Sequence, residues 1–422
     1  MIGSGIFRVP SAIAADAGSV AAVLAVWAAA GLISLFGALC YAELAGLFPR
    51  AGGEYVFLRE GLGSPVAFLF GWTFLLVSPA GWAAVALIFA SYFGTFLAST
   101  ESQTRIIAAA LILVISAVHY RSVRFGASVQ TIATSAKLLA LIVLALAVFW
   151  FGDPSAGSFS GAEPSAVATW GSVGLAMIAA LFAYDGWQTV TGMAGEVRNP
   201  SRNLPVALIG GTALVLFVYL LVNTAYLYAL PLEALAASEL VAVDAVRQAT
   251  GAAGGSLIAA LVMLSTFGAL NALLMANPRI FYAMAQDGLF FRSLAKVHPR
   301  FEAPHVAIAF SAAIAILYVS IRTFEELAEA FIVGFWPFAM LQVAALIALR
   351  KKRPDLPRPY RTFGYPWLPL AFLAASGGLV VNTLVEHPWT TLLSFAVTLA
   401  GLPLFFLWKM VASRRGADRP AR

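Results

Sequence analysis

The chain has 422 residues, of which 61% are hydrophobic and 11% are charged, and its formal net charge is +6. Soluble domains carry roughly 25% charged residues, whereas the mean hydropathy here is +0.87, so the composition excludes a soluble protein. Apolar runs long enough for the roughly 20 residues that cross a bilayer recur along the whole length. Each run is continuous rather than alternating, which favours helices over strands. The sequence therefore predicts an all-α membrane protein with one polytopic domain over residues 1–422.

The charge-poor runs predict twelve membrane spans, the first of them short. In chain order, the predicted spans cover residues 6–16, 18–46, 65–97, 104–120, 125–151, 169–195, 204–230, 255–287, 304–322, 326–349, 364–384 and 388–410. Residue 1 lies inside an apolar run with no charged flank before it, so we expect no signal peptide. We also expect the first helix to be truncated at its N-terminus.

Basic residues are distributed unevenly between the two sides of the predicted membrane. Most of the 26 Lys and Arg residues follow the even-numbered spans, and they include Arg121, Arg124, Arg198, Arg202 and the run 350–353. Because cytoplasmic loops carry the excess of Lys and Arg, we predict that this basic side, with the C-terminus, faces the cytoplasm of a cell (inner) membrane. The net charge then follows from topology, and a nucleic-acid partner is not expected.

Two of the predicted spans, the first and the sixth, are interrupted by glycine. The chain opens MIGSGIFRVP, and Asp185-Gly186 falls near the middle of the sixth span. A single glycine would be explained by close helix packing. Here the two breaks lie five spans apart, and each opens a block of five spans. Corresponding breaks in two halves of a chain indicate an inverted-repeat transporter with its substrate site near the bilayer midplane.

Backbone groups freed at the two breaks suit a zwitterion. N–H groups at the first break would lie at the start of a half-helix, where the helix dipole favours a carboxylate. Carbonyl groups before the second break would lie at the negative end of another half-helix and suit an ammonium group. The sequence thus predicts a small-molecule site of the amino-acid type, with the candidate residues Gly3, Ser4, Gly5, Phe182, Ala183, Tyr184, Asp185 and Gly186. For Asp185, tuning of the site and capping of the second half-helix remain equal alternatives.

Four segments carry a family resemblance: GSGIF, GALCYAELAGLFPRAGGEYVFLREGLG, FAYDGWQTVTGMAGEVRNPSRNLPVAL and NPRIFYAMAQDGLFFRSLAKVHPRFEAPHVAI. With these, nearly the whole chain resembles the amino acid-polyamine-organocation (APC) superfamily, and most closely its L-type amino-acid transporter branch. The resemblance implies the leucine-transporter fold, which has two inverted five-helix repeats followed by two further helices, and alternating access to a central site. The repeats would span residues 1–151 and 169–349, and the extra helices residues 364–410.

The same resemblance implies roles for single residues. Gly3, Ser4 and Gly5 would bind the substrate carboxylate, the carbonyls of Phe182 and Ala183 would bind its amino group, and the Phe182 ring would cover the site as a gate. Asp185 stands where members of the branch vary between Gly and Asp, which weakens the assignment of a substrate. Candidates for the side-chain pocket are Ser78, Pro79, Thr266, Asn271 and Phe335.

Lys137 is a charged residue deep in the fifth span. At 1.5 Å per residue it lies about 18 Å beyond Phe125 at the edge of the span, where an unpaired ammonium costs on the order of 3 kcal/mol or more. The resemblance implies that this lysine replaces the bound sodium of sodium-coupled relatives and that its amine contacts the first span near the break. Lys137 is therefore the candidate coupling residue. A structural role and a role as proton carrier both remain open.

We predict a secondary active amino-acid transporter that works by sodium-independent exchange or by proton-coupled uptake. A carrier for polyamines or other cationic amines is the alternative, but it would be expected to show more intramembrane carboxylates than Asp185. An enzyme is not expected, because the four histidines lie near span ends or in loops without a catalytic or metal-binding pattern. No metal or cofactor is expected either.

The positions of cysteine in the sequence indicate whether a disulfide-linked partner is expected. Eukaryotic relatives in the L-type branch are disulfide-linked to a heavy subunit through a cysteine between the third and fourth spans, and the corresponding LASTESQTR has none. Cys40, the single cysteine, lies inside the second span. We therefore expect no disulfide-linked heavy subunit, and the lipid bilayer and a small amino-acid substrate as partners.

Acidic residues at the basic side are expected to form short-range ion pairs. We predict that Glu43 and Glu54, which flank LFPRAGG, pair with Arg50 or Arg59. Glu196 is expected to pair with one of the arginines that follow it closely in VRNPSRN.

Overall fold

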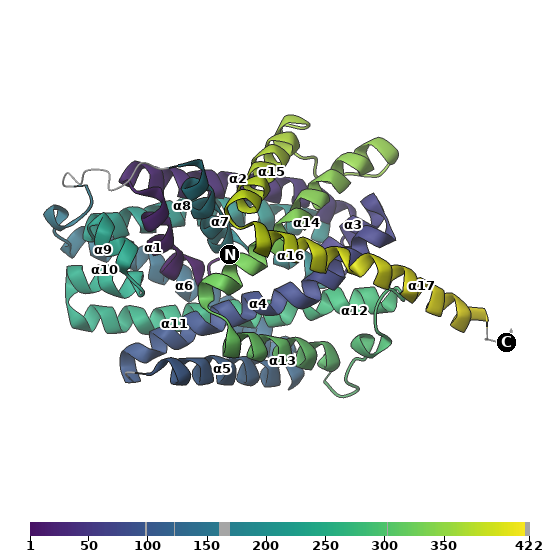
Figure 1. The fold of residues 1–422 in the computed structure, drawn as a ribbon, viewed down its shortest axis with the longest axis horizontal. Coiled ribbons are helices and arrows are strands. Elements are labelled where there is room, and N and C mark those ends of the chain that lie inside the picture. Colours follow the sequence, from purple (N-terminus) through teal and green to yellow (C-terminus); the bar gives the residue numbers. More distant parts are fainter. Residues whose placement is uncertain (98, 122, 160–168, 302, 418–422) are drawn as a thin grey trace.

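The computed structural model describes residues 1–97, 99–121, 123–159, 169–301 and 303–417, with the backbone alone for 123–133, 154, 292 and 411–417. Helices form the secondary structure of these residues (Figure 1). The first part of the chain forms α1 (Gly5–Ala17), α2 (Val20–Leu47), α3 (Glu54–Leu62), α4 (Ser64–Leu97), α5 (Glu101–Arg121), α6 (Val123–Phe151) and the 3₁₀ turn η1 (Pro154–Ala156).

The rest of the described chain is helical in the same way. It forms α7 (Trp170–Tyr184), η2 (Gln188–Glu196), α8 (Pro200–Ala229), α9 (Leu232–Ala237), α10 (Val241–Thr250), α11 (Ala252–Ala276), α12 (Pro278–Gln286), η3 (Arg292–Ala295), α13 (His305–Ile321), α14 (Phe324–Lys352), α15 (Trp367–Glu386), α16 (Pro388–Leu399) and α17 (Gly401–Ala417).

Each predicted span corresponds to a helix or to two consecutive helices. Among the described residues, ten helical segments are long and apolar enough to cross a membrane, and α13 is a shorter apolar helix. The eighth predicted span is divided into α11 and α12 at Pro278, where proline cannot donate the helical hydrogen bond. The short helices α3, α9 and α10 were not predicted. They lie in segments that were expected to be connections between spans.

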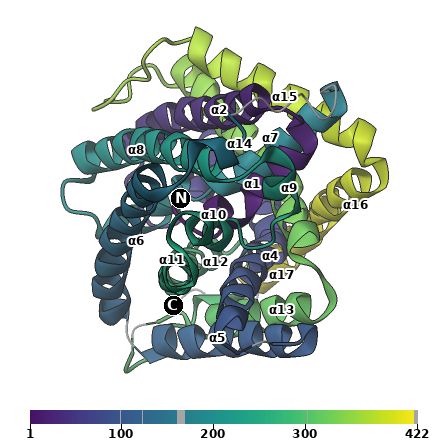
Figure 2. The same cartoon turned by 90° about the vertical axis from the view of Figure 1, so that its left-hand side faces the viewer.

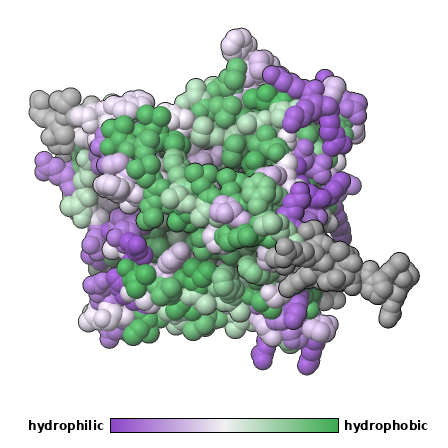
Figure 3. Space-filling model, turned by 45° about the vertical axis from the view of Figure 1, so that its right-hand side comes forward, coloured by the Kyte–Doolittle hydropathy of each residue, from purple (hydrophilic) through white to green (hydrophobic). Residues whose placement is uncertain are grey.

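The surface carries the pattern of a protein that lies in a bilayer. Figure 3 shows a broad hydrophobic band with hydrophilic residues gathered at its two ends. Large apolar side chains are exposed on several helices around the molecule, including Leu113, Leu146, Phe217, Leu317 and Leu393. Such exposure would be costly in water, so the protein is a multi-pass membrane protein.

The two interrupted spans lie next to each other at the centre of the bundle. Helix α1 contacts α7, and α2 contacts α8. In the end-on view of Figure 2, the N-terminus lies among the helices, with α5 and α13 on one side and α2, α8 and α15 on the other. Helix α1 ends at Gly18, whose φ of 65° is the left-handed conformation that closes many helices. Because α1 and α7 pack against each other at the centre of the bundle, both breaks lie in the interior of the protein.

Candidate functional site

A cavity of about 110 Å³ lies between the two breaks. All eight predicted substrate-site residues except Tyr184 line it. The other lining residues are Met1, Ile2, Gly81, Val85, Lys137, Thr189, Ala269, Ala272, Leu273 and Phe331. The Tyr184 ring packs instead against Trp27, with ring centroids 5.8 Å apart. The structure therefore brings together the residues that the sequence placed at two distant breaks.

At the first break, the start of α1 faces the cavity. The helix begins at Gly5, and Ser4 occupies the N-cap position without a side-chain capping bond. The first N–H groups of a helix have no acceptor within the helix and carry the positive end of its dipole. Because Gly3, Ser4 and Gly5 line the cavity, this end of α1 is a suitable place for an anionic group.

At the second break, the chain leaves the helical conformation at Asp185. This residue is extended, with φ −61° and ψ 158°, and Gly186 follows with φ of 99°, a conformation that glycine adopts without strain. The Asp185 carboxylate accepts a hydrogen bond of 2.8 Å from the Gln188 side chain and lines the cavity. A carboxylate and the carbonyl end of α7 thus face the same space, which suits a cationic group.

The two broken helices touch at Gly5 and Ala183. A Cβ atom on Gly5 would lie 2.6 Å from the Cβ of Ala183, a separation that real side chains do not adopt. Glycine is therefore required at residue 5 by the crossing of α1 and α7. The sequence indicated one reason for this glycine, the exposure of backbone N–H groups, and the close contact is a second reason.

Tyr219 of α8 connects the two breaks, and it was not among the predicted site residues. Its hydroxyl donates a hydrogen bond of 3.1 Å to the carbonyl of Ala183, and the backbone N–H of Gly3 bonds to the same hydroxyl. One lone pair of the carbonyl expected to bind the substrate amine is thus already used. A tyrosine in the middle of an otherwise apolar span was the available signal.

Removal of this hydroxyl is expected to weaken substrate binding modestly. Tyr219→Phe deletes the hydrogen bonds of this hydroxyl to Ala183, Met1 and Gly3. A net loss of about 1 kcal/mol for one such bond corresponds to about a fivefold loss of affinity, so we expect a loss of at least this size. Tyr226→Phe is the matched control, because the buried Tyr226 hydroxyl has no hydrogen-bond partner among the described residues. Amino-acid titrations followed by thermal shift would measure both. Equal affinities in the two variants would contradict a role for Tyr219 at the breaks.

Lys137 of α6 reaches the first break. Its side chain is buried, with 6% exposed, and its Nζ donates a hydrogen bond to the carbonyl of Ile2. This contact agrees with the one that the family resemblance implied. Lys137 also lines the cavity, so its amine lies next to the first break. Its role in coupling stays a prediction.

Aromatic rings cover one side of the cavity. The Phe182 ring packs edge-on against Phe324, with centroids 5.7 Å apart, and against Phe331, with centroids 6.2 Å apart. Both partners belong to α14. The role of Phe182 as a gate stays a prediction.

The residues predicted to form a pocket for the substrate side chain lie about one helical turn from the residues that line the cavity. Residues that line it include Gly81 rather than Ser78, Ala269 rather than Thr266, and Phe331 rather than Phe335. Asn271 is instead hydrogen-bonded to His119 at 2.9 Å. The sequence indicated the correct helices, but it did not fix how far along each helix the cavity lies.

We call the end of the protein at which α14 finishes, with Arg350, Lys351 and Lys352, the basic end, and the end at which α14 begins, with Glu325 and Glu326, the acidic end. A smaller cavity shares Asp185, Thr189 and Phe331 with the central one and is also lined by Glu54. The predicted pairing of Glu54 with an arginine is wrong, because its carboxylate accepts a hydrogen bond of 3.2 Å from Tyr41. Burial raises the pKa of Glu54 to about 8, and the Asp185 carboxylate adds to this shift. Both effects favour the protonated form of Glu54.

Stability is expected to depend on pH through Glu54. Its pKa is raised from an ordinary value of 4.5, so the folded protein is fully favoured below that value and loses stability as the pH rises toward 8. Glu54→Gln should remove this slope, whereas the exposed Glu233→Gln should keep it. Thermal unfolding of the purified protein from about pH 5 to about pH 9 would measure it. An unchanged slope in Glu54→Gln would exclude Glu54 as its source.

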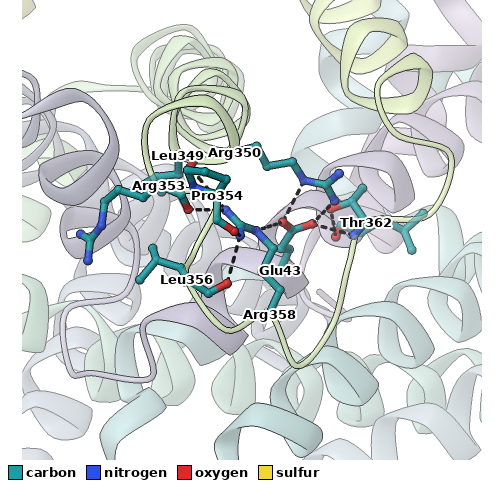
Figure 4. Close-up of polar contacts among 9 residues, drawn as sticks. Glu43, Leu349, Arg350, Arg353, Pro354, Leu356, Arg358 and Thr362 are labelled. Atoms are coloured by element: carbon teal, nitrogen blue, oxygen red, sulfur yellow. Dashed lines mark hydrogen bonds and ion pairs between the residues drawn. The ribbon is translucent and has the colours of Figure 1, made fainter.

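Glu43 forms a buried ion cluster near the basic end (Figure 4). Its carboxylate pairs with Arg350 at 2.5 Å and with Arg358 at 3.1 Å, and it accepts a hydrogen bond of 2.7 Å from the N–H of Thr362. The predicted pairing with Arg50 or Arg59 is therefore wrong. The cluster joins the end of α2 to the end of α14 and to the segment that follows it.

Two other ion pairs at the same end also join distant segments. Glu196 pairs with Arg279 at 2.7 Å, not with the arginines that follow it in the sequence, and Arg59 pairs with Asp287. The first pair links η2 to α12, and the second links α3 to the residue that follows α12. The basic end is thus closed by contacts between helices.

Comparisons with known proteins agree with this architecture. A family model described as amino acid permease matches residues 1–407. The chain is 31% identical to the serine/threonine exchanger SteT of Bacillus subtilis over 410 residues, 96% of this chain and 93% of that protein. It is 32% identical to the b(0,+)-type amino acid transporter 1 of Mus musculus, over 97% of this chain and 85% of that protein. It is 34% identical to the large neutral amino acids transporter small subunit 2 of Homo sapiens, over 96% of this chain and 77% of that protein.

Proposed function

The chain belongs to the amino acid permease family of the APC superfamily, and on this premise we propose that it moves amino acids across the cell membrane by alternating access to the cavity between α1 and α7. The observation that carries the proposal is that both broken helices present their backbone ends to one cavity. A carboxylate would lie at the start of α1, and an ammonium group at the end of α7 near Asp185. The family is one of transporters, and we propose no catalytic activity for this chain.

Contacts on both sides of the cavity would open in turn. Toward the acidic end, Phe182 packs on α14, and Arg8 of α1 pairs with Glu325 of α14 at 2.8 Å. Toward the basic end, the Glu43 cluster joins α2 to α14. A substrate that enters from one side must separate one set of contacts while the other set holds. This order is what alternating access requires.

We propose that residues 1–151 and 169–349 form the two inverted repeats, followed by two extra helices over 364–410. The pairing of α1 with α7 and of α2 with α8 supports this division, because each pair joins helices at equivalent places in the two blocks. We further propose that the basic end and the C-terminus lie in the cytoplasm, following the distribution of Lys and Arg.

Sodium-independent exchange is the transport mode that we propose, with proton-coupled uptake as the second candidate. One relative is described as a serine/threonine exchanger, and the Lys137 ammonium occupies the position next to the first break. The polyamine alternative is disfavoured, since the named relatives transport or exchange amino acids. We propose that no metal or cofactor is needed.

Transport by the purified protein would test the function directly. Proteoliposomes are loaded with one amino acid or left empty, and uptake of each of the twenty radiolabelled amino acids and of putrescine is measured. We expect amino-acid uptake that is stimulated by internal amino acid. Uptake of putrescine without amino acids would contradict the proposed substrate class. Equal uptake into loaded and empty vesicles would contradict exchange.

We propose that the carrier works without a disulfide-linked heavy subunit. Cys40 is the single cysteine of the sequence, and it is buried. Non-reducing gels of native membranes are therefore expected to show the chain at its monomer mass, with no shift on reduction. A larger band that collapses on reduction, and that a Cys40→Ser variant lacks, would overturn this proposal.

A further inference from the structure

A second cavity, larger than the central one, lies between α4, α13, α14 and α16. We call it the α14–α16 groove. Its volume is about 400 Å³, which falls in the range of roughly 300–1,000 Å³ typical of ligand sites. Most of its wall is apolar, with Val77, Ala80, Leu327, Val333, Leu393 and Val397 among the lining residues. It does not share lining residues with the central cavity.

The groove opens onto the lipid-facing surface. Leu393, which lines it, is 65% exposed, and neighbouring Trp389 on α16 is 83% exposed. Along α14, the groove runs from Glu326 to Gly334, which is about 12 Å of helix. Half of a hydrocarbon core of about 30 Å is about 15 Å, so the length of the groove is slightly less than the thickness of one leaflet. An apolar occupant from the bilayer is therefore favoured over a water-soluble one.

Charged side chains of both signs line one end of the groove. The guanidinium of Arg322 lies 3.6 Å from the carboxylate of Glu326, which is longer than a hydrogen bond, so its donors remain available to an anion. Glu329 also lines this end and pairs with His387 at 2.6 Å. One guanidinium and two carboxylates complement a headgroup that carries both a phosphate and an amine.

We propose that the α14–α16 groove binds a phospholipid with a phosphate and a primary ammonium in its headgroup. The phosphate lies at Arg322, the ammonium lies at Glu326 and Glu329, and one acyl chain fills the apolar part beside Leu393. Helix α14 also contributes Phe331 to the central cavity. An acyl chain in the groove would thus pack against the same helix that carries Phe324 and Phe331, the two rings that Phe182 contacts.

The test compares lipid retention by purified variants. Ala330 is exposed and lines the groove, so Ala330→Trp should fill it, while Ala396→Trp adds the same side chain at an exposed position of α16 outside the groove. Arg322→Ala removes the phosphate partner, and the exposed Arg247→Ala is its matched control. Each protein is exchanged into detergent with dioleoyl phosphatidylethanolamine, phosphatidylglycerol or phosphatidylcholine. Bound lipid is then counted by native mass spectrometry, and size-exclusion profiles confirm folding.

We expect the wild type and both controls to retain phosphatidylethanolamine in preference to the other two lipids. Retention should fall by roughly fivefold or more in Ala330→Trp and in Arg322→Ala, in line with the loss of one charge-assisted contact or of the apolar site. Equal retention in the groove variants and their controls would overturn the proposal. A preference for phosphatidylglycerol would overturn the assigned headgroup, because that lipid has no ammonium group for the two carboxylates.

Discussion

Replacement of Lys137 by methionine is expected to reduce amino-acid uptake by roughly tenfold or more. The substitution keeps an unbranched side chain only one atom shorter but removes the ammonium that donates to the Ile2 carbonyl. A buried carbonyl that loses its donor costs about 1–3 kcal/mol, and this carbonyl lies directly before the residues at the start of α1. The backbone conformation of the first break should therefore change, and with it the place proposed for the substrate carboxylate.

Uptake into proteoliposomes, with sodium or choline outside and with or without a pH gradient, would measure this effect. Lys137→Arg keeps the charge and a donor, and should retain more uptake than Lys137→Met. Wild-type uptake should be the same in sodium and in choline. Stimulation by a proton gradient that disappears in Lys137→Met would identify Lys137 as a proton carrier. Sodium-stimulated wild-type uptake, or a fully active Lys137→Met, would refute the structural role.

Gly5→Ala is expected to reduce uptake by about 10–100-fold, because misplacement of binding groups by about 1 Å can have an effect of this size. The added methyl group would lie 2.6 Å from the Cβ of Ala183, so α1 and α7 must move apart. The cavity between them would then lose its shape. Gly210→Ala is the control, since a Cβ at Gly210 would meet no atom within 4 Å.

The double variant Gly5→Ala/Ala183→Gly separates a backbone contact from a side-chain contact. A Cβ at residue 5 would lie even closer to the Cα of Ala183 than to its Cβ, which would be 2.6 Å away, and Ala183→Gly removes only the Cβ. If the close approach of the two backbones is the cause, the double variant should recover little of the lost uptake. Full recovery, seen as a large interaction energy in the mutant cycle, would show instead that the Ala183 methyl group alone makes glycine necessary at residue 5.

The breaks were predictable because they stand out against a uniform background. Glycines and an aspartate inside long apolar runs are visible without any knowledge of the fold, and both breaks line one cavity. Which turn of each surrounding helix completes the wall of the cavity was not predictable. Helical periodicity tells which residues share a face, but it does not tell how deep a cavity lies, and so Phe335 was expected where Phe331 lies.

The ion pairs at the basic end show a second limit. Glu43 was expected to find an arginine nearby in the sequence, but its partners Arg350 and Arg358 are more than 300 positions away. Which charges meet depends on how the ends of the helices are arranged, and the sequence pattern does not give this arrangement. Likewise, the short helices α3, α9 and α10 are too short to produce a span signal, so they were treated as connections.

The contact between Gly5 and Ala183 also bears on when the protein becomes able to bind. The two helices that form the cavity are made at different times during synthesis, because five helices, α2 to α6, lie between α1 and α7 in the chain. Until α7 is inserted, the N–H groups at the start of α1 have no opposing wall. The binding cavity is thus a late product of biogenesis, and a nascent chain released after α6 would be embedded in the membrane but unable to hold an amino acid.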